Sequence, residues 1–394
     1  MVGVGIYAGF YSEEQAIEAI DFHTVGLLLG MMTLVALLQP TGFFEYIATW
    51  VGRVSKGKPI LLLILLGTIT TVLSMLLDNV TTVVIIAPVA ILISEILGMS
   101  AIPLLMALAL LSNTGGTGTL IGDPPNILIG SAAGLSFNDF LVNALPVVII
   151  AWIVVLGLLL YLFRKDLSKK PENADAVQKL NPSKALNDPS TALKVVIVLG
   201  FTIILFFLQD LLGLSASFIA LAAAGVALIW TRPNTQELFE RIEWNVLIFF
   251  IALFVMVGGL EASGALDQLA DMMSEAADLN PVLLGVIFIW GVAILSAIVD
   301  NIPITIALIP VILQLGASGI NTAPLWWALA FGAGFGGNAT IIGSTANIVV
   351  ASLSERTRTP ITSAVWTKRG LPAMIAACIV ATILYVVFFP YYSN

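Results

Sequence analysis

Residues 77–82 read LDNVTT, and residues 115–126 read GGTGTLIGDPPN. The second half of the chain repeats this arrangement, because residues 299–305 read VDNIPIT and residues 336–347 read GGNATIIGSTAN. The matching positions lie about 222 residues apart. Each copy places an acidic residue and several small polar residues inside long apolar stretches. Paired hydrophobic segments that glycine and proline interrupt predict two related halves whose polar interruptions form one binding site.

The composition of the chain places it in a membrane. Of its 394 residues, 59% are hydrophobic and only 10% are charged, far from the values of soluble domains. Uncharged runs long enough to cross a bilayer recur along the chain, at 60–77, 101–122, 143–163, 211–231, 281–299, 301–354 and 370–394. We therefore expect an all-α, polytopic membrane protein without a sizeable soluble domain.

Several functional classes are disfavoured by the residues that the chain lacks. It has one cysteine, Cys378, and one histidine, His23, so disulfides, thiolate clusters and multi-histidine metal sites are excluded. We find no nucleophile and base in a pattern that indicates an enzyme. The net charge of −8 gives no sign of a nucleic-acid partner. The expected surroundings are the lipid bilayer.

The basic residues predict which side of the membrane each loop occupies. All sixteen Lys and Arg fall in four groups, at 53–58, 164–194, 232–241 and 356–369. By the positive-inside tendency, these groups are cytoplasmic. Eight crossings place every group on that side: 24–44, 101–134, 143–163, 192–210, 211–231, 244–262, 324–350 and 371–391.

The segments 59–98 and 281–318 keep this count unchanged if each enters and leaves on the same face. They could be tight pairs of crossings, but we favour re-entrant hairpins, because an Asp-Asn corner at membrane depth needs protein or water around its free backbone groups. An odd number of crossings separates equivalent positions, so the repeats are inverted.

The predicted organisation is therefore two halves and a linker. The first inverted repeat covers 1–163, a cytoplasmic linker covers 164–191, and the second repeat covers 192–394. The second repeat has two helices, at 192–210 and 211–231, where the first has only 1–22.

Carboxylates are the strongest functional candidates. A charge in an apolar stretch is costly and predicts function, and Asp78 and Asp300 are duplicated, so we expect both to carry protons or coupling ions. Asp123 is a third candidate, although its counterpart is Ser344. For the neighbouring Asn79 and Asn301 the alternative interpretation is structural, since Asp or Asn at a helix start is often an N-cap.

Neutral groups surround these acids in the sequence. The glycine pairs predict close backbone approach and positive φ angles; they are Gly115, Gly116, Gly336 and Gly337. The candidate substrate-binding residues are Asn79, Thr81, Thr82, Asn113, Thr117, Thr119, Asn126, Asn301, Thr305, Asn338, Thr340, Ser344 and Asn347.

The doubled motif resembles the ion transporter superfamily, in the branch of arsenite-efflux permeases, NhaD-type sodium/proton antiporters and P proteins. The Asp-Asn order at both tips and the run GDPPN at 122–126 are more similar to P proteins. The resemblance covers about 20–390. It implies two hairpins with tips at 78–82 and 300–305, and two helices unwound within 112–126 and 334–347. It also implies a dimer with a scaffold part and a moving transport part.

Three activities follow as hypotheses. The first, which the resemblance implies, is proton-coupled efflux of arsenite or antimonite. Three carboxylates in segments without a basic residue also suit a cation or a neutral oxyacid. The second is sodium/proton antiport, and the third is sodium-coupled symport of an anion or dicarboxylate, in which added cations offset the repulsion. A proton or sodium ion is the expected coupling ion, with no other cofactor or metal. A soluble ATPase subunit is a candidate partner.

Overall fold

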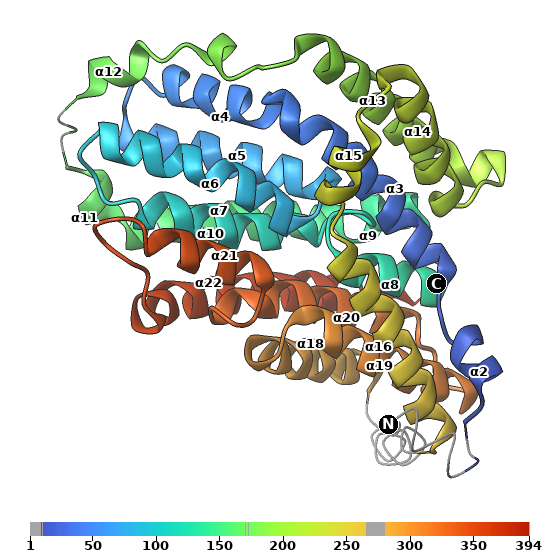
Figure 1. Ribbon diagram of the computed structural model, residues 1–394. Helices are drawn as coiled ribbons and strands as arrows, with labels where there is room; N and C mark the ends of the chain where they lie inside the picture. Colours follow the sequence, from blue (N-terminus) through green and yellow to red (C-terminus); the bar gives the residue numbers. More distant parts are fainter. Residues whose placement is uncertain (1–8, 10, 170, 172, 265–279, 394) are drawn as a thin grey trace.

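The computed structural model describes residues 9, 11–169, 171, 173–264 and 280–393. Figure 1 shows an all-helical molecule, with long helices side by side. Eight helices in the described part are long and apolar enough to cross a membrane. Together with the shorter broken helices, they form a multi-pass membrane fold.

Each half begins with a single helix and continues with a hairpin. In the first half the single helix is α3 (Phe22–Leu38), and the shorter α4 (Phe43–Val54) follows it. The hairpin is the pair α5 (Pro59–Leu76) and α6 (Asn79–Ile96). A broken helix follows as α7 (Ile102–Gly116) and α8 (Pro124–Ala133). The half ends with α9 (Phe137–Asn143) and α10 (Leu145–Leu162).

The second half repeats this order. Its single helix is α16 (Trp244–Ala262), and its hairpin is α18 (Pro281–Ile298) with α19 (Asn301–Ala317). Its broken helix consists of α20 (Ala323–Gly336), the short 3-10 turn η4 (Gly337–Ala339) and α21 (Thr345–Ser354). The long helix α22 (Ser363–Val387) then corresponds to α10, and α23 (Phe389–Tyr392) ends the described chain.

Further elements connect the halves or precede them. The short α2 (Glu13–Glu18) lies before α3, and η1 (Gln39–Thr41) follows it. The linker holds α11 (Arg164–Leu167), α12 (Ala174–Gln178) and the 3-10 turn η2 (Pro182–Lys184). The helices α13 (Pro189–Leu212) and α14 (Ala216–Thr231) are joined through α15 (Thr235–Arg241) to α16. The two additional helices that the sequence predicts at 192–210 and 211–231 are present as α13 and α14.

Packing follows the repeat. The first hairpin arm α5 packs on α7, and its counterpart α18 packs on α20 in the same way. The second arms cross over, because α6 packs on α21 and α19 packs on α8. The two halves are consequently interlocked around their broken helices. At the periphery, α14 packs on α3 and α13, along the upper edge in Figure 1.

The hairpins are re-entrant, as the sequence predicted. Asn79 at the first tip and Asn301 at the second both donate hydrogen bonds to the same carboxylate, that of Asp123. Both tips therefore meet at one point inside the protein, beside the first helix break. The polar tips are thus enclosed by protein, which satisfies backbone groups that lipid cannot.

The sidedness of the loops stays a prediction, and labelling tests it. In a Cys378→Ser background, a cysteine replacing Lys179 in the linker should react only from the cytoplasmic face. A cysteine replacing the exposed Val142 on α9 should react only from the opposite face. A membrane-impermeant maleimide applied to intact cells and to everted vesicles measures both. Labelling of both positions from one side would contradict the inverted arrangement.

Candidate functional site

The candidate site lies where the two helix breaks and the two hairpin tips converge. The first break covers 117–123 between α7 and α8, and the second lies between η4 and α21. Both breaks are narrower than the sequence predicted, because Ser112 and Asn113 are helical, and so is the glycine pair that follows them. The helix ends therefore bring backbone and side-chain polar groups together at one point.

Glycine permits this convergence through close contact. A Cβ on Gly116 would lie 2.7 Å from the carbonyl oxygen of Gly122, and one on Gly337 would lie 2.7 Å from that of Gly343. The expectation of close approach at the two glycine pairs is met. The expectation of positive φ angles is wrong, since none of the four has one. The helix continues through these glycines, so they serve packing and not a turn.

Asn113 is the hub of the central hydrogen-bond network. Its amide nitrogen donates to the side-chain oxygens of Asn338 at 3.1 Å and Asn347 at 2.9 Å. Its oxygen accepts from the amide of Asn79 at 3.1 Å and from the hydroxyl of Ser344 at 3.0 Å. All five residues are buried. The first hairpin tip and both predicted helix breaks thus meet on one side chain.

Asp123 lies beside this hub and contacts both hairpin tips. Its side chain is 2% exposed. The amide of Asn301 donates to Oδ2 at 3.0 Å, and that of Asn79 donates to Oδ1 at 3.5 Å. Asp78 and Asp300 directly precede the two asparagines that donate to Asp123, so three acids belong to this region. No Lys or Arg occurs between Lys58 and Arg164 or between Arg241 and Arg356, so no basic residue of these segments offsets their charge.

Asp78 and Asp300 occupy the N-caps of the second hairpin arms. Asp78 Oδ1 accepts the backbone N–H of Thr81 at 2.8 Å, and Asp300 Oδ1 accepts that of Ile302 at 3.1 Å. The structural role that the sequence left open for the neighbouring asparagines thus belongs to the aspartates. The asparagines instead point their amides into the centre. Asp300 has a further partner, because the Thr345 hydroxyl donates to its Oδ2 at 2.9 Å.

The remaining predicted residues hold the breaks in shape. The amide of Asn126 donates to the carbonyls of Gly116 and Thr119, and Asn347 does the same to Gly337 and Thr340. Three hydroxyls donate to the backbone carbonyl four residues earlier; they belong to Thr82, Thr117 and Thr305. Two hydroxyls of the breaks donate instead to the first hairpin arms, Thr119 to the carbonyl of Met75 and Thr340 to that of Ala297. These residues position the site and do not present their hydroxyls to its centre.

The sequence reasoning missed Glu243, which directly precedes α16. The hydroxyl of Thr81, on the first hairpin tip, donates to Glu243 Oε1 at 3.4 Å. Glu243 lies 222 residues after Asp21, which caps α3, so the repeat itself carried the signal. Thr81 and Glu243 border a crevice that is also lined by Gln39 and Arg241. Glu243, an acidic residue outside the hairpin tips, therefore contacts the first tip from the start of α16.

An inverted repeat with two re-entrant hairpins, two broken helices and a shared buried acid defines a secondary transporter. The chain belongs to the citrate transporter family, whose model matches residues 1–332. It is 40% identical over 377 residues to an uncharacterized transporter of Mycobacterium tuberculosis, covering 94% of this chain and 87% of that one. Members of a transporter family are generally not enzymes.

Two further comparisons agree with this assignment. The human P protein is 30% identical over 444 residues, which cover 92% of this chain and 53% of that protein. The solved structure of the YdaH transporter of Alcanivorax borkumensis has a TM-score of 0.64 at 18% identity, covering 98% of this chain and 89% of that one. The latter likeness concerns the fold alone.

Proposed function

We propose that this protein is a proton-coupled exporter of a small neutral oxyacid, with undissociated arsenite or antimonite as the first candidates. The observation that carries this proposal is the composition of the centre. Asn113 both donates and accepts there, Ser344 supplies a hydroxyl, and Asp123 supplies a carboxylate. A polyhydroxylated neutral molecule needs such a mixture of donors and acceptors. The buried carboxylate gives the coupling proton a binding group.

Sodium is the second candidate, as the ion exchanged for protons. The observation that favours it is the set of three carboxylates, Asp78, Asp123 and Asp300, in segments that contain no Lys or Arg. The family name raises citrate as a third candidate. A trianion would be repelled by the same three acids unless bound cations compensated its charge. The site therefore supports an anionic substrate least.

Flux measurements separate these candidates. Everted vesicles that contain the protein are given an imposed pH gradient, and uptake of arsenite, sodium and citrate is followed separately. We expect arsenite uptake that collapses with the gradient, and none in vesicles that carry the Asp123→Asn variant. Sodium movement without arsenite movement would establish the second candidate and reject the first. Citrate uptake would reject both.

We further propose that the hairpins and broken helices move as one body against α3, α13, α14 and α16. The packing supports this division, because contacts between the two groups depart from the repeat. α3 packs on α8, whereas its counterpart α16 packs on α19. The first hairpin tip, at Thr81, also lies beside the last turns of α3, at Val35 and Gln39. In alternating access, any single state holds the two halves in different positions, so this difference between the two repeats is expected.

A dimer in which α13 and α14 form part of the fixed scaffold is consistent with this proposal. Both helices carry large exposed apolar residues along their length. They include Phe201, Phe207, Leu211, Phe218, Val226 and Ile229. Lipid or a second copy of the chain would cover them. A soluble ATPase partner remains a proposal that no contact in the described chain supports.

The paired tip acids give a first mutational prediction. Asp78→Asn and Asp300→Asn should each reduce coupled flux strongly while the protein stays folded. Asn caps a helix about as well as Asp, so a loss of flux would report charge rather than capping. Proteoliposome flux and the thermal unfolding temperature measure the two properties. Wild-type flux in both variants would reduce these residues to helix caps.

The contact between Glu243 and Thr81 gives a second prediction. Glu243→Leu should release the first hairpin tip and raise the thiol reactivity of a cysteine at Val84, which lines the same crevice. Loss of one hydrogen bond predicts a rise of about 2–10-fold. Glu243→Gln keeps the acceptor and is the matched control, with reactivity near that of the parent. Equal reactivity in both variants would show that this contact does not hold the tip.

A further inference from the structure

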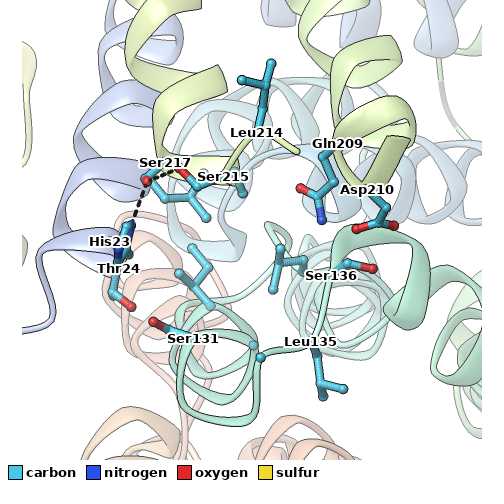
Figure 2. Close-up of a pocket in the computed structure, with 16 residues that line it drawn as sticks. His23, Thr24, Ser131, Leu135, Ser136, Gln209, Asp210, Leu214, Ser215 and Ser217 are labelled. Carbon is cyan, nitrogen blue, oxygen red and sulfur yellow. Dashed lines mark hydrogen bonds between the residues drawn. The ribbon is translucent and has the colours of Figure 1, made fainter. Parts of the chain in front are cut away.

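A second cavity lies between α8 and the proposed fixed group, and it reaches the first helix break at Leu120. Its volume is about 330 Å³. One wall is formed by the start of α3 and the turn from α13 to α14, and the other by α8 and the residues that follow it. Leu27, Leu120 and Ile127 are buried and make part of its lining apolar. Figure 2 shows polar side chains from both walls around the opening.

Gln209 supplies the most unusual group in this cavity. Its side chain is 6% exposed, and Figure 2 shows the amide pointing into the cavity. Among the described residues, its Oε1 atom has no hydrogen-bond donor. A buried carbonyl oxygen without a donor costs free energy, which a ligand that donates a hydrogen bond would recover.

The remaining polar groups add negative charge and acceptors. Asp210 accepts one hydrogen bond, from the Asn138 amide at 2.8 Å, and forms no ion pair with the described part of the chain. The imidazole of His23 is bonded through Nδ1 to the Ser217 hydroxyl at 3.1 Å. No Lys or Arg is among the described residues that line the cavity. Its chemistry therefore selects against anions.

We propose that this cavity binds a small organic ammonium compound with an apolar body, and that its occupancy slows transport. The ammonium group would donate to Gln209 Oε1 near the Asp210 carboxylate, and the apolar body would cover Leu27 and Ile127. A cavity of this size with an apolar lining and a few convergent polar groups is typical of small-molecule sites. Neither Gln209 nor Asp210 belongs to the central site.

The regulatory part of this inference rests on the proposed function. α8 begins at Pro124, directly after Asp123 of the central site, and it forms one wall of the cavity. The opposite wall belongs to α3, α13 and α14, which are the proposed fixed group. A ligand that contacts both walls would hold α8 against that group. It would therefore oppose the movement that exposes the central site to the other side.

Cysteine protection tests the binding site without any transport measurement. In a Cys378→Ser background, the exposed Ser131 on the cavity rim is replaced by Cys, and its modification by a methanethiosulfonate reagent is timed in purified protein. Benzylammonium is the probe, and it should slow the reaction. Benzoate should not slow it, and benzyl alcohol should do so only weakly. A cysteine at Val142, which is 65% exposed and outside the cavity, is the control.

Variants of Gln209 decide whether its oxygen is the recognition group. Gln209→Leu should raise the half-protecting concentration of benzylammonium at least about tenfold, because a hydrogen bond to a charged donor is lost. Gln209→Glu keeps an acceptor, adds charge and should protect at least as well as the parent. Unchanged Ser131→Cys reactivity without the probe shows that each variant is folded. Protection by benzoate, or equal protection in the Leu variant, would overturn the site.

Transport then tests regulation. Benzylammonium should slow flux in the wild-type protein over the same concentrations that protect the cysteine, and the Gln209→Leu variant should resist it. Protection without slowed flux would overturn the regulatory role. Absence of flux with arsenite, sodium and citrate would reject the proposed function, and the protection result would still decide whether the site exists. The two failures are therefore distinguishable.

Discussion

Replacing Asp123 with Asn is expected to abolish proton-coupled flux and to leave the protein folded. Asp123 is the carboxylate that both hairpin tips contact, through Asn79 and Asn301. Asn has nearly the same size and keeps one oxygen that accepts a hydrogen bond, but it cannot take up a proton. Loss of a positioned proton-transfer group predicts a fall of at least about 100-fold.

The measurement is flux in proteoliposomes under an imposed pH gradient, with thermal unfolding in detergent as the test of folding. Asp175→Asn is the matched control, because Asp175 is exposed on α12 of the linker and far along the chain from both tips. It should transport at the wild-type rate. Near wild-type flux in the Asp123→Asn variant would show that coupling depends on another group.

Replacing Gly336 with Ala is expected to destabilise the protein measurably. A Cβ at this position would lie 2.6 Å from the carbonyl oxygen of Ala293 and 2.7 Å from its Cα. These are backbone atoms of α18, so they cannot move aside as a flexible side chain would. Overpacking of this kind costs about 1–3 kcal/mol, and the packing of α18 on α20 would loosen.

Gly291→Ala provides a control on the same hairpin. Gly291 lies in α18, and an added Cβ there would meet nothing within 4 Å. The unfolding temperature of the purified Gly336→Ala variant should fall by several degrees, whereas that of Gly291→Ala should stay constant or rise slightly. Equal unfolding temperatures would mean that α18 and α20 do not need this close approach.

Much of the fold was predictable because each sequence motif occurs twice, once in each half of the chain. The Asp-Asn tips gave the hairpins, and the glycine pairs gave the broken helices within a few residues. The exact ends of the breaks were not predictable, since helix α7 runs through Gly115 and Gly116 with ordinary φ angles. Glycine there permits contact with Thr71 and Gly122 rather than a turn. Composition alone does not separate these two uses.

The roles of individual polar residues were less predictable. Sequence alone could not tell that Asp78 caps a helix while Asn79 points its amide at Asp123, because the two side chains are adjacent and similar. Glu243 was missed for a different reason. Its partner Thr81 lies 162 residues away, and only the tertiary arrangement brings α16 to the first hairpin. The repeat matches Glu243 with Asp21, but Asp21 caps α3 and gives no sign of a contact with a hairpin tip.

The Asn113 network also sets a condition on how the chain is made. Asn113 and its partner Asn338 are 225 residues apart, and both are fully enclosed in the finished protein. At about 5–20 residues per second, a ribosome needs roughly 11–45 s to supply the second amide after the first. During that interval the amide of Asn113 has none of its second-half partners. The polar groups of the first half must therefore stay in contact with water or with the insertion machinery during that interval. The site is completed only after its second-half partners have been made.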